Sequence, residues 1–338
     1  MASLDIGIDL GTCEILAGNP GRGILVREPS IVAVNKRTSK IISIGSEVYK
    51  MLGRTPDYIE IVRPMSDGII SDYKMTGVLI KYILSCISRN RLIRPRLIIC
   101  VPSATTGIES QSVIDAAVEA GARQVHLIEE PVAAALGAGL DIMKPLGRMV
   151  IDIGGGTSDI AVLSLRGVVC KVSLKTAGRS FDEAIMRYIR QKYGLLVGER
   201  TAEEIKIEIG SVWEGDSPAE TAAKGRNLVS GLPAQVQITR RELLPILREI
   251  AGAILAGAQS VLERTPPELV GDIRSHGVVI TGGSALLSGM DRFISGGIKA
   301  EAYVADNPAE CVAIGTAMGF SYLGKLYGGF LETTGHVH

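Results

Sequence analysis

Aromatic side chains are scarce in this sequence: they make up 4% of 338 residues, whereas hydrophobic residues as a whole make up 46%. The core must therefore be mainly aliphatic. An excess of charge of one sign is also missing, because 36 basic and 36 acidic residues cancel. A balanced chain has no general attraction for a polyanion, so the composition argues against nucleic-acid binding.

Paired cysteines and long apolar runs are missing as well. The five cysteines are odd in number, scattered, and form no CxxC pair. This argues against a disulfide framework or a zinc site and fits a reducing cytoplasm. No run of about eighteen uncharged apolar residues suits a membrane span, and the first residues lead into a strand pattern rather than a signal peptide. The length favours two domains.

Glycine is abundant, and three glycines stand together in IDIGGGTSDIAVL, residues 151–163. Without Cβ atoms, Gly154, Gly155 and Gly156 allow positive φ and let several N–H groups approach one anion. Asp152 ends the incoming strand, where a carboxylate would repel phosphate unless a cation lay between them, so we interpret it as an outer ligand of hydrated Mg²⁺. Thr157 and Asp159 are expected to face the same space. A lone GGGT is more often an ordinary hairpin.

The chain contains this pattern twice. IGIDLGTCEI, residues 6–15, is again a strand, an aspartate, a glycine, a threonine and a second strand, with Asp9, Gly11 and Thr12 in the corresponding places. The two aspartates are 152 − 9 = 143 residues apart. Two phosphate hairpins in two similar halves predict a duplicated fold that holds one nucleotide between the halves.

These hairpins resemble the phosphate loops of the actin, Hsp70 and sugar kinase superfamily. Further blocks are similar to the MreB/Mbl branch of bacterial actins, the rod-shape-determining proteins. They include RPMSDGIISDY, RPRLIICVPS, LIEEPVAAALGAG, KYGLLVGERTAEEIKIEIGS, GLPAQVQIT, LERTPPELVGDI and VVITGGSALLSGM. The resemblance runs in the family's order from Asp5 to about Leu323.

The alternation of strand and helix patterns predicts an α/β protein. The resemblance implies an actin-like fold of two RNase H-like domains with a nucleotide cleft between them, each carrying a small inserted subdomain. The expected boundaries are 1–30, 72–140 and 314–338 for the first domain core, 31–71 for its insert, 141–180 and 238–313 for the second core, and 181–237 for its insert.

The candidate catalytic carboxylate is Glu130, which stands before Pro131 between a strand and a helix. An EEP sequence can be merely a charged helix start, but the resemblance implies that Glu130 orients the water that attacks the γ-phosphate, with Glu129 as the second candidate. The resemblance also implies that Thr157 and Asp159 hold this water. The family usually has Glu at the second of these sites.

Two more blocks are candidates for the nucleoside. Glu203 and Lys206 lie three residues apart on a predicted helix and so share a face, suitable for ribose and base. Such a pair is often only a solvated salt bridge. The resemblance also implies an adenosine loop formed by Gly282, Gly283, Ser284 and Ala285, with Ser284 where a third glycine is common.

The sequence departs from the family beside the first hairpin, where Cys13 and Glu14 replace the usual Ala and Asn. Both are counted as nucleotide-binding candidates. A Glu14 carboxylate turned toward the β-phosphate would cost about a few kcal/mol in a site of low dielectric. Turned to solvent, it would change nothing.

A membrane signal lies in SRNRLIRPR, residues 88–96, where Leu92 and Ile93 are flanked by arginines. Such a pair can enter a bilayer while the arginines meet anionic headgroups, each contributing about 1 kcal/mol. The alternative is a loop with the pair folded inward.

We expect a cytoskeletal ATPase that binds ATP or ADP with Mg²⁺, polymerises with itself, and lies on the inner face of the cytoplasmic membrane, where it organises cell-wall synthesis. The resemblance implies partners such as RodZ and MreC/MreD. The alternative is a filament protein that hydrolyses ATP poorly or not at all. An Hsp70-like chaperone or a sugar kinase fits less well, because no substrate-binding domain or acceptor motif is visible.

Overall fold

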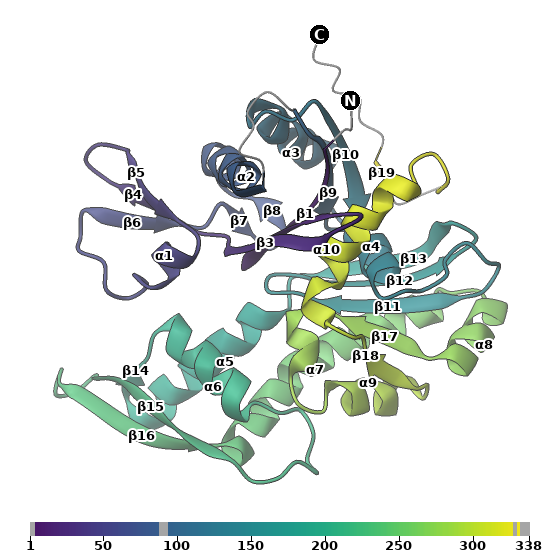
Figure 1. Cartoon of the computed structure of the whole chain (residues 1–338). Coiled ribbons are helices and arrows are strands. Elements are labelled where there is room, and N and C mark those ends of the chain that lie inside the picture. The colour runs from purple at the N-terminus through teal and green to yellow at the C-terminus, as the bar shows by residue number, and fades with distance from the viewer. Residues whose placement is uncertain (1–3, 88–93, 327–329, 332–338) are drawn as a thin grey trace.

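The computed structural model describes residues 4–87, 94–326 and 330–331. Two large sheets dominate it: six strands in the order β19-β10-β9-β1-β2-β3, and five in the order β13-β12-β11-β17-β18. Figure 1 shows them one above the other, with α4 and α10 between them and a small sheet beside each at the left. The chain therefore has the two similar halves that the repeated hairpin predicts.

The first large sheet begins with an antiparallel meander of β1 (Asp5–Leu10), β2 (Glu14–Asn19) and β3 (Gly23–Pro29). On its other side β1 is parallel to β9 (Arg96–Val101), and β9 to β10 (Gln124–Glu129), which pairs with β19 (Phe330–Leu331). Alternate residues of β9 face opposite layers. One layer is α2 (Tyr73–Ile87) with α3 (Gly107–Glu119), and the other is α4 (Glu130–Gly137).

The second large sheet repeats the meander with β11 (Arg148–Ile153), β12 (Ser158–Ser164) and β13 (Gly167–Leu174). Here β17 (Val278–Thr281) and β18 (Ala302–Val304) continue the sheet in parallel with β11. The helices of this half are α5 (Gly178–Tyr193), α6 (Glu199–Ile209), α7 (Arg240–Glu263), α8 (Pro267–His276) and α9 (Met290–Ile298).

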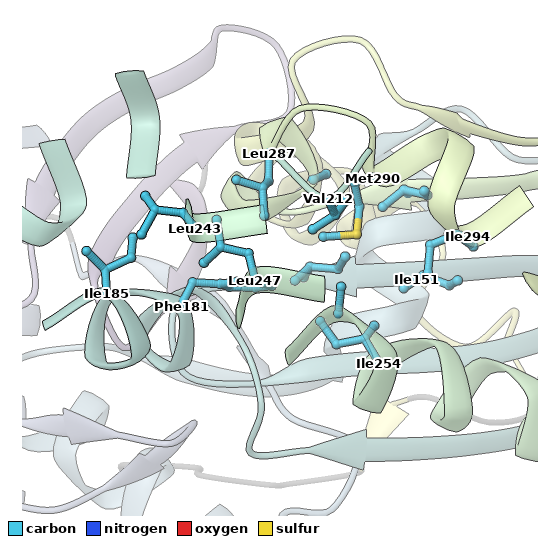
Figure 2. Close-up of a cluster of buried hydrophobic side chains, with 14 of the residues drawn as sticks. Ile151, Phe181, Ile185, Val212, Leu243, Leu247, Ile254, Leu287, Met290 and Ile294 are labelled. Atoms are coloured by element: carbon cyan, nitrogen blue, oxygen red, sulfur yellow. The ribbon is translucent and has the colours of Figure 1, made fainter. Parts of the chain in front are cut away.

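The core of the second half is aliphatic, as the composition predicts. Phe181 of α5 is the one aromatic side chain among the buried members of this cluster within the described residues. Figure 2 shows it among Ile185, Leu243 and Leu247, which come from α5 and α7. Of the described helices, α7 alone has the length and apolar character of a membrane span, but its inner face packs into this cluster. The apolar composition of α7 is therefore explained by its packing in the core.

Each half also carries a small three-stranded sheet. In the first half it consists of β4 (Val32–Asn35), β5 (Ile41–Ile44) and β6 (Ile59–Val62), with the short helix α1 (Ser46–Tyr49). In the second half it consists of β14 (Leu195–Leu196), β15 (Glu220–Asn227) and β16 (Pro233–Thr239). The first sheet falls within the range expected for its inserted subdomain, whereas β16 of the second runs two residues past the expected end at 237; the domain boundaries themselves stay a prediction.

Local departures from the expected elements have simple causes. The strand pattern expected over 226–239 is the hairpin of β15 and β16, whose first strand begins earlier, at Glu220. The helix expected to reach Trp213 ends at Ile209, because Gly210 follows with an extended backbone. A two-residue turn at Asp67 and Gly68, both with positive φ, joins β7 (Met65–Ser66) to β8 (Ile69–Ile70).

Among the described residues, the chain passes between the large sheets twice, once through α4 and once into α10 (Cys311–Met318). The two helices touch backbone to backbone. A Cβ on Gly137 would lie 1.8 Å from the carbonyl oxygen of Cys311, and one on Gly315 would lie 1.8 Å from that of Ala133. The glycines therefore permit this contact, which brings both halves together around one cleft.

Candidate functional site

A cleft of about 810 Å³ opens between the two halves. Both glycine hairpins line it, as do residues of α1, α5 and α6. The predicted residues along its wall are Asp9, Gly11, Thr12, Cys13, Glu14, Glu130, Asp152, Gly154, Gly155, Gly156, Thr157, Glu203, Lys206, Gly282, Gly283 and Ser284. Residues far apart in the sequence thus meet at one site.

The two hairpins press against each other at the centre of the cleft. A Cβ on Gly155 would lie 2.3 Å from Cys13 Sγ, and one on Gly156 would lie 2.4 Å from Thr12 Oγ1. Neither these glycines nor Gly154 has a positive φ. The expectation of left-handed backbone here was therefore wrong: the glycines are required because the facing hairpin comes too close for a side chain.

Asp9 and Asp152 lie near the ends of the first strands of the two hairpins; Asp152 is buried and Asp9 is partly exposed. Burial, with the charge of Asp152, raises the pKa of Asp9 to about 8, and burial raises that of Asp152 to about 7. Asp152 Oδ1 accepts a hydrogen bond of 2.6 Å from Thr281 Oγ1. This pair fits a divalent cation, which would offset the charge of the two carboxylates.

A cation here would also need ligands from outside the protein. Within the described residues, no group of three or more His, Cys, Asp or Glu side chains could hold a metal ion. Mg²⁺ keeps several waters and is commonly bound through one or two carboxylates plus phosphate oxygens. The geometry is therefore compatible with a hydrated Mg²⁺ shared between Asp9, Asp152 and a nucleotide.

The two adjacent glutamates have different surroundings. Glu129 Oε2 accepts a hydrogen bond of 2.6 Å from Lys171 Nζ on β13, and Glu129 does not line the cleft. Glu130 does line it, and Thr157 Oγ1 lies 3.5 Å from Glu130 Oε2. Burial, followed by the charge of Asp159, raises the pKa of Glu130 well above its ordinary value. A carboxylate with a raised pKa is suited to accept a proton from water.

Asp159 lies behind Glu130 rather than on the cleft wall. Its Oδ1 accepts from the Ser103 backbone N–H over 2.9 Å, and its Oδ2 accepts from Ser173 Oγ over 3.1 Å. The side chain is fully buried and also shares a hydrogen bond with the Glu130 carboxyl group. Asp159 is therefore placed beside Glu130 and not on the cleft wall, where the resemblance implied that it holds the attacking water.

At the nucleoside end, Glu203 and Lys206 share a face of α6 but do not pair with each other in the described structure. Lys206 Nζ lies 2.8 Å from Asp182 Oδ1, while Glu203 Oε2 accepts a hydrogen bond of 2.7 Å from Tyr49. The simple salt-bridge interpretation of the pair is thus replaced by two separate contacts. Neither contact blocks the face that borders the cleft.

The loop after β17 closes this end of the cleft. Gly282 has φ 85, and a Cβ there would lie 2.3 Å from the carbonyl oxygen of Ile153. Gly283 begins η1 (Gly283–Leu286), and Ser284 Oγ donates a hydrogen bond of 2.9 Å to the Gly154 carbonyl. Ala285 is buried and is not part of the cleft wall. Ser284 therefore ties the loop after β17 to the second glycine hairpin.

Glu14 points along the sheet toward Arg27, whose Nε lies 3.9 Å from Glu14 Oε2. Its side chain is 47% exposed. Burial raises its pKa, and the charge of Arg27 opposes the rise. Of the two outcomes considered for Glu14, the structure favours the orientation toward solvent and a cation.

Tyr49, Arg63 and Arg179 are among the cleft residues that sequence reasoning missed. Arg63 and Tyr49 belong to the first half, yet their partners Glu199 and Glu203 belong to the second. Arg63 opens the block RPMSDGIISDY, whereas no quoted block contains Tyr49. The membrane candidates Leu92 and Ile93 lie outside the described residues.

The sequence is similar to those of known proteins over almost its whole length. The family profile described as MreB/Mbl protein matches residues 3–327. The cell shape-determining protein Mbl of Bacillus subtilis is 44% identical over 327 residues, covering 96% of this chain and 98% of Mbl. The cell shape-determining protein MreB of Escherichia coli is 43% identical over 321 residues, covering 93% of this chain and 92% of MreB.

The fold is also similar to that of solved structures. A crystal structure of MreB5 of Spiroplasma citri bound to AMPPNP has a TM-score of 0.91 and 36% identity, covering 96% of this chain and 98% of that one. The MamK double helical filament has a TM-score of 0.81 at 18% identity, covering 95% of this chain and 99% of that one, and this likeness supports the fold alone.

Proposed function

The chain belongs to the MreB/Mbl family and has the actin-like fold, and from this we propose that it is a cell shape-determining cytoskeletal protein that binds ATP and polymerises into filaments. The observation that carries the proposal is the meeting of two glycine hairpins in one cleft, with buried carboxylates beside them. Nucleotide binding is supported by the similar MreB5 structures, which are bound to AMPPNP and to ADP.

We further propose slow hydrolysis of ATP linked to assembly. Glu130 would accept a proton from water on the cleft side, while Thr157, 3.5 Å away, would orient the same water. Asp159 would keep the Glu130 side chain in place. Mg²⁺, when bound with the nucleotide, would offset phosphate charge, and Asp9 and Asp152 are the residues that would hold its water shell.

Location and partners form a separate proposal. The arginine-flanked pair Leu92 and Ile93 supports contact with the inner face of the cytoplasmic membrane. Filaments lying there would organise cell-wall synthesis, through proteins of the RodZ and MreC/MreD kinds. The support for these partners is family membership.

The decisive experiment measures phosphate release with Mg²⁺ and ATP over a range of protein concentrations, beside sedimentation of filaments. Turnover should rise with assembly and fall by about 10² or more in Glu130→Gln, without loss of nucleotide binding. Glu129→Gln is the matched control, because its carboxylate pairs with Lys171 away from the cleft, and it should keep its turnover. Filaments without any turnover would contradict the ATPase and leave nucleotide a structural role.

Membrane contact is tested by flotation with anionic liposomes. Leu92→Asp combined with Ile93→Asp should abolish flotation while leaving assembly intact. Leu25→Asp, at an exposed leucine on β3, is the control and should float like the unaltered chain. Equal flotation of all three proteins would contradict the proposed membrane loop.

A further inference from the structure

Six basic residues line the cleft, and five of them have partners within the protein. Carboxylates of Glu310, Glu199, Glu204 and Asp182 pair with Arg27, Arg63, Arg200 and Lys206, and carbonyls of Ile209 and Ser217 accept from Arg240. The sixth is Arg179, whose guanidinium has no hydrogen bond or ion pair within residues 4–87, 94–326 and 330–331. Of these cations, it alone is left free to meet a ligand.

The backbone at Arg179 is fastened to the phosphate hairpin. Its N–H donates to the Gly155 carbonyl over 2.8 Å, and the preceding N–H, of Gly178, donates to the Gly154 carbonyl over 3.0 Å. Two residues further on, Phe181 is fully buried in the core of the second half (Figure 2). The first turn of α5 is thus held between the core and the hairpin, so the position of Arg179 is fixed.

A cation at this point opposes the local helix field. Arg179 occupies the first turn of a 16-residue helix, where the partial positive charge of the helix disfavours another positive charge. No acidic residue occupies that turn. The arrangement is unfavourable in the protein alone and becomes favourable when an anion lies beside the hairpin.

The positive charge of Arg179 acts at the point where the two hairpins meet. Cys13 lies there, against Gly155. Burial and Glu203 raise the pKa of the Cys13 thiol, and Lys206, Arg63 and Arg179 oppose this rise. Lys206 and Arg63 are already paired with carboxylates, so the uncompensated charge is that of Arg179.

We propose that the Arg179 guanidinium binds the polyphosphate of the nucleotide beside Gly155. The inference rests on the proposed function and adds to it a phosphate-binding residue outside both hairpins. Arg179 offsets part of the repulsion between the phosphates and the carboxylates of Asp9, Glu130 and Asp152. Its bond to phosphate is charge-assisted and can be bidentate.

The test is calorimetric titration of the full chain with MgATP and MgADP. Arg179→Ala should weaken both affinities about ten- to a hundredfold, since a charge-assisted bond is lost. Arg179→Lys should recover part of the lost affinity, because lysine restores the charge but not the two parallel N–H donors of the guanidinium. Arg187→Ala is the matched control: it removes a cation of the same helix at an exposed position outside the cleft and should stay within about threefold of the unaltered chain.

Thermal unfolding without nucleotide checks that the variants fold, and Arg179→Ala should melt close to the unaltered chain. Equal affinity of the unaltered chain and a folded Arg179→Ala would overturn this inference and leave the proposed function standing. An equal loss in Arg179→Ala and Arg187→Ala would also overturn it, because the effect would then be one of general charge. If the unaltered chain bound neither nucleotide, the proposed function would fail first.

Discussion

Tyr49 of α1 and Glu203 of α6 face each other across the cleft, and the tyrosine hydroxyl donates a hydrogen bond of 2.7 Å to Glu203 Oε2. The Arg200 guanidinium lies 5.8 Å from the centre of the Tyr49 ring, and Arg63 pairs with Glu199 nearby. Helix α1 and Arg63 of the first half are therefore joined to α6 of the second half at the mouth of the cleft. Glu203, a candidate for ribose binding, is positioned from the opposite half.

Tyr49→Phe removes this hydrogen bond and keeps the ring. A bound nucleotide should then dissociate about two- to tenfold faster, because one neutral-to-charged hydrogen bond across the mouth is lost. Stopped-flow release of a fluorescent nucleotide measures the rate. Tyr58→Phe is the control, since Tyr58 is exposed beside β6 and does not line the cleft. Identical rates in both variants would show that the bond does not retain the nucleotide.

Glu14→Gln should change MgATP affinity by less than about threefold, because the half-exposed carboxylate is turned toward Arg27 and solvent. Equilibrium titration checks this. A rise in affinity of more than about tenfold would mean that Glu14 repels phosphate after all.

Asp159→Asn should move the acidic limb of the hydrolysis profile to lower pH. Burial and then the charge of Asp159 raise the pKa of Glu130 in the unaltered chain, so removing that charge lets Glu130 ionise at lower pH. Phosphate release measured across the acidic range tests the direction. Ser173→Ala removes a hydrogen bond to Asp159 but leaves its charge, and its limb should stay in place. If the acidic limb stayed in place in both variants, Asp159 would not influence the ionisation of Glu130.

Removing Mg²⁺ with a chelator should weaken ATP binding, because the carboxylates of Asp9 and Asp152 would then meet the phosphates without a cation. Asp152→Asn should reduce the difference between the affinities with and without Mg²⁺. Asp141→Asn, at a carboxylate that pairs with Lys144 outside the cleft, is the control. An unchanged Mg²⁺ effect in Asp152→Asn would exclude Asp152 from the ion's surroundings.

Glu242 should stabilise the second half in a pH-dependent way. It caps α7, accepting from the Thr239 backbone N–H and from Thr239 Oγ1 over 2.8 Å each, and from the Tyr193 hydroxyl over 2.6 Å. Burial alone would raise its pKa, but the bonds from Lys192, Tyr193 and Thr239 hold the pKa well below its ordinary value. This stability is present above the unfolded pKa and is lost as pH falls below it.

Glu242→Gln should therefore lower the free energy of unfolding by about 1 to 3 kcal/mol at neutral pH. The gap between the two proteins should narrow as the pH falls below the ordinary glutamate pKa of 4.5, because the unfolded chain then binds a proton at this carboxylate while the folded chain, with its lower pKa, does not. Urea unfolding at several pH values measures it. Glu263→Gln, exposed at the other end of α7, should show no such trend. A gap that is constant with pH would contradict the depressed pKa.

Local patterns predicted the parts of the site that local chemistry determines. The two hairpins and the Glu130–Pro131 junction carry their own signals, because glycine, aspartate and proline each restrict the backbone around them. Asp159 shows the limit. The register pairs it with Asp152, but Ser103, which covers it, comes from a loop 56 residues earlier. What lies over a strand residue cannot be derived from the strand.

The cross-cleft residues could not be predicted for the same reason. Tyr49 and Glu203 are 154 residues apart, and α1 has only four residues, too few for a periodic pattern. Arg179 did leave a signal, since a basic residue in the first turn of a helix is unfavourable without an anion. That signal becomes informative only once the phosphate hairpin is known to lie beside it.

The backbone contact of α4 with α10 constrains how the halves can move. At Gly137 and Gly315 no side chain separates the two backbones, so a larger residue at either position would push α4 and α10 apart and change the angle between the halves. At the far side of the cleft, Tyr49 and Arg63 hold the halves together through α6, and we expect a bound nucleotide to change the angle between the halves by adding contacts there.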